Sequence, residues 1–372
     1  MTQNQAAWAK APFDRLVVGE APYTLPGPGL ILVRNRAVAV NPVDRYKQQA
    51  GNLLFGWIKY PAVFGYDLAG EVVAVGPDVT RFKVGDRVVG TATGMDKERN
   101  SAAEGAFQLY TLVLAHMASV IPDGLSFEAA CVLPLGLSTA ASGLFGADQL
   151  GLSGPEVNPK DQGQTVLIWG GSSSVGCNAI QLAKAAGYRV VTTASPRNFA
   201  MVKGLGAAEV FDHGNPTVVE DIIKALAGRH VAGALAMGEG SAVACIGVLG
   251  HCEGNRHVAL ATFPLKFDTL PERPGFGAVL TRVLPMVLVG GGGMWLRAKR
   301  LGVKISVIYG TGLANTDLSR VIFDAFLPQA LQSGAFVPAP APMVVGHGLA
   351  AIQTGFDRHR QGVSAAKVVV TL

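Results

Sequence analysis

A turn of small residues stands between two apolar stretches in the middle of the chain. Thr165–Trp169 is apolar and β-branched enough for a buried strand, and Cys177–Ala186 has apolar residues at helical spacing. The backbone N–H groups of such a turn, together with the helix N-terminus that follows it, can bind a pyrophosphate. The residues that would form this anion site are Gly171, Ser173, Ser174, Val175 and Gly176.

The spacing of the turn matches the Gly-x-Gly-x-x-Gly pattern of dinucleotide-binding folds, with Ser173 in place of the middle glycine. A further apolar stretch, Arg189–Thr193, completes a strand–helix–strand unit long enough for a parallel crossover. A tight turn in another doubly wound sheet would give a similar local pattern. The placement between strand and helix favours a dinucleotide site.

The residues after the second strand indicate which dinucleotide would bind. NAD sites place Asp or Glu there for the ribose 2′-hydroxyl, but Thr192–Asn198 contains no acid. Ser195 can hydrogen-bond to a 2′-phosphate and Arg197 can pair with it, whereas a carboxylate would repel it. We therefore predict NADPH; the alternative is that Arg197 is a solvated loop charge.

The composition bounds the remaining possibilities. The 372 residues are 49% hydrophobic and only 15% charged, enough for two domains with filled cores. The net charge of +5 is scattered without a basic run, so nucleic-acid binding is not indicated. The partner that we expect is a small-molecule substrate.

The compartment can be inferred from the cysteines and the termini. The four cysteines form no disulfide framework or zinc ribbon, and we expect free thiols in a reducing compartment. The N-terminus lacks an apolar signal core, and the apolar run near Val283–Met294 is too short and glycine-rich for a membrane span. We expect a cytosolic protein that does not cross a membrane.

The elements that must position the turn fall into two groups. Residues 1–130 read as many short strands, an all-β pattern better suited to a distorted barrel than to a sandwich. From Thr165 onward strands and helices alternate, as in a doubly wound parallel sheet. Between them, Ser126–Phe145 is expected to be helical and broken at Pro134. Further helices and a closing strand are expected at Leu318–Ser333, Leu349–Gln361 and Lys367–Leu372.

Motifs along almost the whole chain stand in the order typical of one family. They are Ala39–Asp44, Phe64–Val72, Val84–Val88, Leu133–Ala140 and Gly362–Val369. The chain resembles the medium-chain dehydrogenase/reductase (MDR) superfamily, most closely its zinc-free CipB/ToxD-type oxidoreductases, with trans-acting enoyl reductases and quinone oxidoreductases as relatives. The resemblance implies an α/β fold: a GroES-like catalytic domain, residues 1–130 and 313–372, and a Rossmann NADPH-binding domain, residues 131–312. It also implies a homodimer.

The resemblance predicts, position by position, whether this chain has the zinc ligands of its zinc-dependent relatives. Zinc-dependent relatives place Cys where this chain has Asn41, a His-Glu pair where it has Tyr66–Asp67, and a second Cys where it has Leu135. The structural zinc lobe is missing too, since Thr91–Phe107 contains no cysteine. The group His251–His257 has ligand types but reads as a helix–strand loop. We therefore expect no metal.

Without a metal, hydride transfer from NADPH to an activated C=C of an enone or enoyl thioester, or to a quinone, remains feasible. Asn41 is the candidate for orienting the nicotinamide or the substrate carbonyl. Tyr46 matches a tyrosine of quinone reductases and could donate a hydrogen bond or proton. Tyr66 could face the same cleft. Either tyrosine could instead be a packing residue.

The resemblance also implies further cofactor contacts. Lys203 and His213 match positions around the adenosine 2′-phosphate, where His replaces the tyrosine of relatives. Thr139 is expected beside the diphosphate or the nicotinamide ribose. The segment Phe263–Gly302 departs most from the family and is either a flap or interface element near the cleft, or an added solvent loop. Two other functions stay open: a non-redox step in secondary metabolism, or NADPH binding without catalysis.

Overall fold

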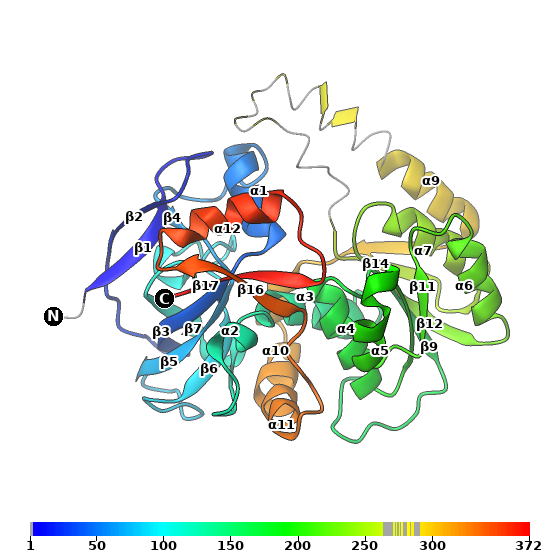
Figure 1. Ribbon diagram of the computed structural model, residues 1–372, viewed down its shortest axis with the longest axis horizontal. Helices are drawn as coiled ribbons and strands as arrows, with labels where there is room; N and C mark the ends of the chain where they lie inside the picture. Colours follow the sequence, from blue (N-terminus) through cyan, green and yellow to red (C-terminus); the bar gives the residue numbers. More distant parts are fainter. Residues whose placement is uncertain are drawn as a thin grey trace.

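The computed structural model describes residues 3–262 and 291–372, together with single positions between 271 and 285. Two lobes lie side by side, and both termini belong to the same lobe (Figure 1). Half of the segment Phe263–Gly302, predicted to be a flap, an interface element or a solvent loop, lies outside the described residues; its last part, Gly292–Leu301, is helix α9. Half of the apolar run Val283–Met294 also lies outside them.

The first lobe is built on strand β3 (Leu30–Ala39), which is paired on both edges. The main sheet has the order β16-β17-β3-β5-β6-β8, with β7 also paired with β3, and a small sheet has the order β2-β1-β4. Because β17 pairs antiparallel with β3, the end of the chain completes this lobe. The other strands are β1 (Asn4–Ala9), β2 (Val17–Ala21), β4 (Ala62–Val63), β5 (Asp67–Val75), β6 (Arg87–Thr91), β7 (Tyr110–Leu114), β8 (Ala118–Val120), β16 (Ala341–His347) and β17 (Ala366–Thr371).

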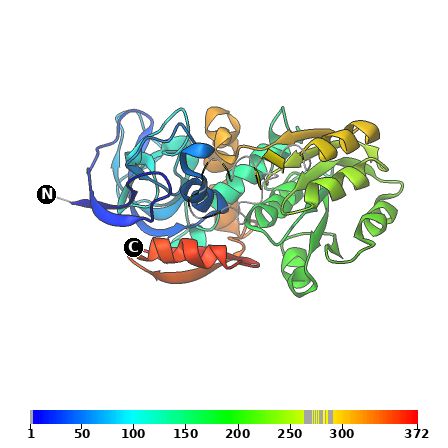
Figure 2. The ribbon, with the colours of Figure 1, turned by 90° about the horizontal axis from the view of Figure 1, so that it is seen from above.

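Helix α1 (Pro42–Ala50) corrects the expectation that residues 1–130 are all-β. Asn41 caps it in a capping box with Asp44, whose carboxylate accepts the Asn41 backbone N–H at 2.8 Å. Pro42 occupies the first helical turn, where its missing N–H costs nothing. Pro42 and the capping box are local signals for the start of a helix. The helix is short and largely buried, so it has no apolar stripe from which the sequence pattern could have predicted it. In Figure 2, helix α12 (Ala351–Arg360) covers another face of the same lobe.

The second lobe is a parallel sheet of order β11-β10-β9-β12-β14-β15. This is the order 3-2-1-4-5-6 of a doubly wound Rossmann fold, with the crossover reversal between β9 and β12. The fold class expected from the sequence is therefore confirmed. The elements are β9 (Thr165–Trp169), α4 (Ser174–Ala185), β10 (Arg189–Ala194), α5 (Phe199–Gly204), β11 (Glu209–Asp212), α6 (Val218–Leu226), β12 (His230–Ala236), α7 (Ser241–Leu249), β13 (Glu253–Gly254), β14 (His257–Leu260) and β15 (Lys304–Val307).

Helices between the lobes share one core with both (Figure 1). Ser126 caps α2 (Phe127–Ala130) by accepting the Ala129 N–H, and Pro134 opens α3 (Pro134–Phe145), as expected. The helix expected at 318–333 is present but contains a π-helical segment, η9, between α10 and α11. Its parts are α10 (Leu318–Arg320), η9 (Val321–Phe326) and α11 (Leu327–Ser333).

One segment of the described chain, Phe127–Phe145, is long and apolar enough by composition to cross a membrane. In the structure 72% of it is buried inside the protein. Leu133, Leu137 and Leu144 of this segment are fully buried in the shared core. We interpret it as a core helix pair, since burial against protein explains its hydropathy.

Candidate active site

The turn between β9 and α4 has the geometry of a phosphate-binding turn. The Ser173 side chain caps α4 by accepting the Gly176 N–H at 3.0 Å, which gives the serine at the middle glycine position a structural role. A Cβ on Gly171 would lie 2.2 Å from Thr192 Oγ1, and one on Gly176 would lie 2.3 Å from the Gly170 carbonyl oxygen. Both glycines are therefore required for strand and helix to approach each other. Ser174 and Val175 form the first turn of α4, and Ser174 Oγ donates to the Val132 carbonyl at 3.5 Å.

We expect Gly176→Ala to lower the free energy of unfolding by about 1–3 kcal/mol, because the new methyl group has no room against the Gly170 carbonyl. Nucleotide affinity should fall as well, because the turn must open. Chemical denaturation and calorimetry measure the two effects. Gly124→Ala is the matched control, since a Cβ at Gly124 meets nothing within 4 Å. Equal stability of the two variants would contradict the tight packing of this turn.

Three of the residues expected around the adenosine ribose come from neighbouring strand ends. Ser195, after β10, lies 3.1 Å from His213 Nε2, after β11. Arg197 is exposed in the same loop as Ser195, and its Nη2 donates to Ser364 Oγ of the first lobe at 3.3 Å. Lys203 is exposed in the last turn of α5. The structure thus brings Ser195 and His213 together and adds Ser364, which the sequence did not suggest.

Thr139 lies on α3 where the two lobes meet. Its hydroxyl donates to the Leu135 carbonyl at 2.7 Å. A Cβ on Gly310, the first residue of the 3-10 helix η8 (Gly310–Asn315), would lie 2.1 Å from Thr139 Oγ1. The backbone after β15 therefore packs directly on Thr139. This residue stays a predicted cofactor contact.

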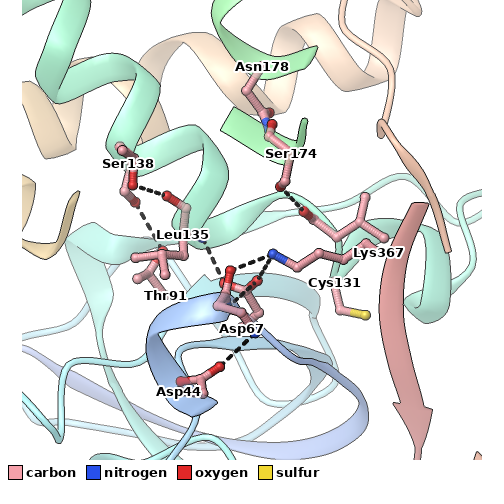
Figure 3. Close-up of polar contacts among 12 residues, drawn as sticks. Asp44, Asp67, Thr91, Cys131, Leu135, Ser138, Ser174, Asn178 and Lys367 are labelled. Carbon is pink, nitrogen blue, oxygen red and sulfur yellow. Dashed lines mark hydrogen bonds and ion pairs between the residues drawn. The ribbon is translucent and has the colours of Figure 1, made fainter. Parts of the chain in front are cut away.

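Asn41 belongs to a buried polar group centred on Asp67, which is labelled in Figure 3. Lys367 Nζ donates to Asn41 Oδ1 at 2.5 Å and pairs with Asp67 Oδ2 at 2.8 Å. The same Asp67 oxygen accepts from Asn41 Nδ2 at 2.9 Å. The other, Oδ1, accepts the backbone N–H of Leu135, at the start of α3, at 2.7 Å. The side chains of Asp67 and Lys367 are 0% and 4% exposed, so this is an enclosed ion pair with its lone pairs engaged.

A second polar group begins at the next residue along the chain. Lys47 Nζ, on α1, donates to the Tyr66 hydroxyl and, at 3.3 Å, to the Met95 carbonyl. The Tyr66 hydroxyl donates to Asp96 Oδ1 at 3.3 Å. Asp96 also accepts a hydrogen bond from Thr311 of η8, in the other lobe. Lys47 and Tyr66 are buried and Asp96 is half-buried, so the chain of contacts runs from the interior to the surface.

Burial shifts the titration of this second group. It lowers the pKa of Lys47 to about 8, although Asp96 and Asp44 oppose the shift. Burial also raises the pKa of Tyr66 well above its ordinary range, and the Asp96 charge adds to this. The pKa of Asp44 rises to about 7, chiefly by burial. An ammonium that loses its proton near neutral pH, beside a hydroxyl that stays neutral, can donate protons to a reacting oxygen or carbon.

The positions of the three predicted catalytic residues differ. Tyr66 lies in the Lys47 group and Asn41 in the Asp67 group, whereas the Tyr46 ring stacks under the Arg45 guanidinium, 4.9 Å from its centre. None of their roles is tested by this geometry, and they stay predictions. Lys47 was missed, because a lysine in a polar stretch resembles a solvated charge. Its spacing of three from Asp44, which places both on one helix face, was the available signal.

A cavity of about 220 Å³ adjoins this group. Met95 lines it, and the Met95 carbonyl accepts both Lys47 Nζ and, at 3.1 Å, Trp57 Nε1. Ile58, Pro61 and Val63 supply apolar walls. Met95 connects the cavity to the Lys47 group, whereas the Lys47 and Tyr66 side chains themselves do not line it.

Two family models match the chain on either side of the lobe junction. Residues 27–123 match the alcohol dehydrogenase GroES-like domain, and residues 174–244 match the domain named zinc-binding dehydrogenase. Curated relatives match over the whole length. The chain is 49% identical to dehydrogenase pigH of Monascus ruber over 376 residues, covering 100% of both. The protein therefore belongs to the medium-chain dehydrogenase/reductase superfamily, whose members are oxidoreductases that bind a nicotinamide cofactor.

Other relatives are similar over nearly all of the chain. The zinc-binding alcohol dehydrogenase domain-containing protein cipB of Emericella nidulans is 42% identical, with 99% of this chain and 98% of cipB covered. Trans-enoyl reductase himH of Aspergillus japonicus is 38% identical, with 99% and 97% covered. The resemblance to cipB and to trans-enoyl reductases expected from the sequence is confirmed.

Solved structures share the arrangement of both lobes. An alcohol dehydrogenase superfamily protein from Novosphingobium aromaticivorans superposes with a TM-score of 0.73 at 28% identity, covering 100% of both chains. CurK enoyl reductase gives 0.72 at 19% identity, covering 100% of this chain and 99% of its own. The mycobacterial protein Rv1454c, complexed with NADPH, gives 0.67 at 22% identity with both chains fully covered. The likeness to CurK and to Rv1454c shows only that the fold is shared.

The residues at the positions of the catalytic zinc ligands do not fit a zinc ion. Asn41 Oδ1 and Asp67 Oδ2 both face the Lys367 ammonium, so a cation already holds these oxygens. Tyr66 and Leu135 supply no ligand of the usual kinds. Across residues 3–262 and 291–372 no three His, Cys, Asp or Glu side chains gather as a metal cluster. His257 of the group 251–257 instead bonds Ser306 Oγ at 2.8 Å.

Proposed function

We propose that the protein is a zinc-independent, NADPH-dependent reductase acting on an activated C=C of an enone or enoyl thioester, or on a quinone. The observation that carries this proposal is the buried pair of Lys47 and Tyr66 at the lobe junction. Tyr66 stands where zinc-dependent relatives have a histidine ligand. A hydroxyl backed by an ammonium can stabilise negative charge on a carbonyl oxygen where a Lewis acid is missing.

The proposed chemistry uses the chain's own residues for positioning and proton transfer. NADPH would supply the hydride. Tyr66 stays protonated because its pKa is raised. Its hydroxyl, which donates to Asp96 Oδ1 in the structure, would turn to donate to the developing enolate oxygen instead. Two of the three Lys47 N–H donors have partners among the described residues, which leaves one for substrate. Lys47 gives up its proton more readily than an ordinary lysine and replaces the proton consumed at the α-carbon.

The NADPH preference is supported by the adenosine end of the site. The loop after β10 carries no carboxylate, and Ser195, Arg197 and His213 offer hydrogen-bond donors there. Gly171 and Gly176 permit the close backbone approach that a diphosphate needs. The homodimer, the cytosolic location and the residue limits of the two domains stay predictions.

The direct test mixes the protein with NADPH and a panel of enones, enoyl thioesters and quinones, and follows loss of the nicotinamide absorbance. Turnover of at least one class is the expected result. A zinc chelator should leave the rate unchanged, with metal analysis of the same sample as the control. Binding of NADPH without turnover of any class would contradict the reductase proposal and favour a binding or non-redox role.

We expect Arg197→Ala to lower the ratio of kcat/KM with NADPH to that with NADH about tenfold or more, because it removes a cation from the 2′-phosphate. Steady-state kinetics with both cofactors measure the ratio. Arg189→Ala is the control: this arginine is also exposed, but it lies on β10, before the loop, and pairs with Glu209 at 3.1 Å. An unchanged ratio in Arg197→Ala would identify Arg197 as a solvated charge.

A further inference from the structure

The loop between α12 and β17 carries a first-lobe residue to the adenosine end of the Rossmann lobe. Ser364 Oγ accepts from Arg197 Nη2 at 3.3 Å, although the two residues are 167 positions apart in sequence. Ser195 and His213 stand in the same region of the second lobe, 3.1 Å from each other. A guanidinium, two hydroxyls and an imidazole therefore come from both sides of the lobe junction.

The backbone holds Ser364 in this position. Ala365, the next residue, has φ of +49°, a left-handed conformation that costs energy for any residue with a Cβ. Arg358 Nη1 donates to the Gly362 carbonyl at 2.8 Å, which fixes the other side of the loop. Both features restrict the conformation of the loop that carries Ser364.

The charges around the loop favour an anion. The last turn of α12 carries Arg358, His359 and Arg360. Asp357, the carboxylate before them on the same helix, pairs with Arg15 at 2.6 Å. The end of the helix that precedes Ser364 therefore carries an excess of positive charge.

We infer that Ser364 is a ligand of the adenosine 2′-phosphate, together with Arg197, Ser195 and His213. A phosphate between Arg197 and Ser364 accepts hydrogen bonds from both lobes at once, so the phosphorylated cofactor draws the lobes together at this edge. A cofactor without the phosphate leaves only the single contact between Arg197 and Ser364. The inference rests on the proposed NADPH dependence and adds a selecting residue from the catalytic lobe.

The test uses fragments of the cofactor and the full chain, without turnover. Adenosine 2′,5′-bisphosphate and 5′-AMP differ only in the 2′-phosphate, and calorimetry gives the affinity of each. We expect Ser364→Ala to weaken the bisphosphate about tenfold and to leave 5′-AMP unchanged. Ser364→Thr, which keeps the hydroxyl, should recover most of the affinity. Thr354→Ala, an exposed hydroxyl on α12, is the control.

Hydrogen exchange gives a second readout. Amides of residues 361–366 should exchange more slowly in the presence of the bisphosphate than with 5′-AMP, and Ser364→Ala should abolish the difference. If Ser364→Ala binds both nucleotides as the wild type does while Arg197→Ala loses the preference, the inference is overturned and the NADPH proposal stands. If the wild type shows no preference for the bisphosphate, both are overturned.

Discussion

Replacing Lys47 with methionine should lower kcat by about a hundredfold to a thousandfold, the usual contribution of a positioned acid. Methionine fills a similar volume but has no proton to give and no charge to place beside Tyr66. The KM should change less than kcat, because the lost interaction is one that strengthens as negative charge develops. Lys83→Met, at a side chain 86% exposed, is the control for removing a lysine. Wild-type kcat in Lys47→Met would exclude Lys47 from the chemistry.

The pH profile separates a chemical role from a structural one. Because the folded-state pKa of Lys47 is about 8, the wild-type kcat/KM should fall as the pH rises above about 8, where the ammonium loses its proton. Lys47→Arg keeps its charge at every accessible pH, so any activity that it retains should lack this decline. A profile with the same decline in both proteins would assign it to another group.

Lys47 should also make the free energy of unfolding depend on pH, with the opposite sign to the dependence of kcat/KM. The pKa of Lys47 falls from 10.5 to about 8 on folding, so the unfolded chain binds more protons between these values. This group therefore makes the protein more stable as the pH rises from about 8 to 10.5, and penalises it below 8. Chemical denaturation of Lys47→Met at pH 7, beside the wild type, distinguishes a loss of activity from a loss of folding.

Replacing Lys367 with methionine should reduce the free energy of unfolding by about 3–5 kcal/mol, the second large effect. The variant leaves the Asp67 carboxylate, which is 0% exposed, without its cation. The hydrogen bonds from Leu135 N and Asn41 Nδ2 remain but cannot replace a full charge. Chemical denaturation measures the change, and calorimetric melting gives its sign independently.

Two comparison variants test whether the loss of stability comes from the unpaired, buried carboxylate. Asp67→Asn added to Lys367→Met removes the uncompensated charge and should restore most of the stability, since the cost comes from the unpaired carboxylate. Arg15→Met breaks the Arg15–Asp357 pair, whose side chains are 65% and 44% exposed, and should cost less than about 1 kcal/mol. Equal losses in Arg15→Met and Lys367→Met would show that the enclosed pair has no special weight.

Local patterns in the sequence determined the fold class and the place of the nucleotide turn. The run Thr165–Trp169, the small residues after it and the stop at Gly187 are short-range signals, and the structure has β9, the turn and α4 where they predict them. Pro134 and Ser126 likewise act on their own neighbours, so the break between α2 and α3 was readable. Family motifs then indicated a GroES-like domain beside the Rossmann domain.

The partners of the site residues were decided by the tertiary structure alone. Asn41 and Lys367 are separated by 326 positions, and Arg197 and Ser364 by 167, so no window of sequence contains either pair. Lys47 is ordinary in its own stretch; its pKa is lowered because the fold buries it, against the opposing charges of Asp96 and Asp44. Local propensity is a property of neighbours along the chain, whereas burial and charge depend on residues that meet only after the two lobes have packed.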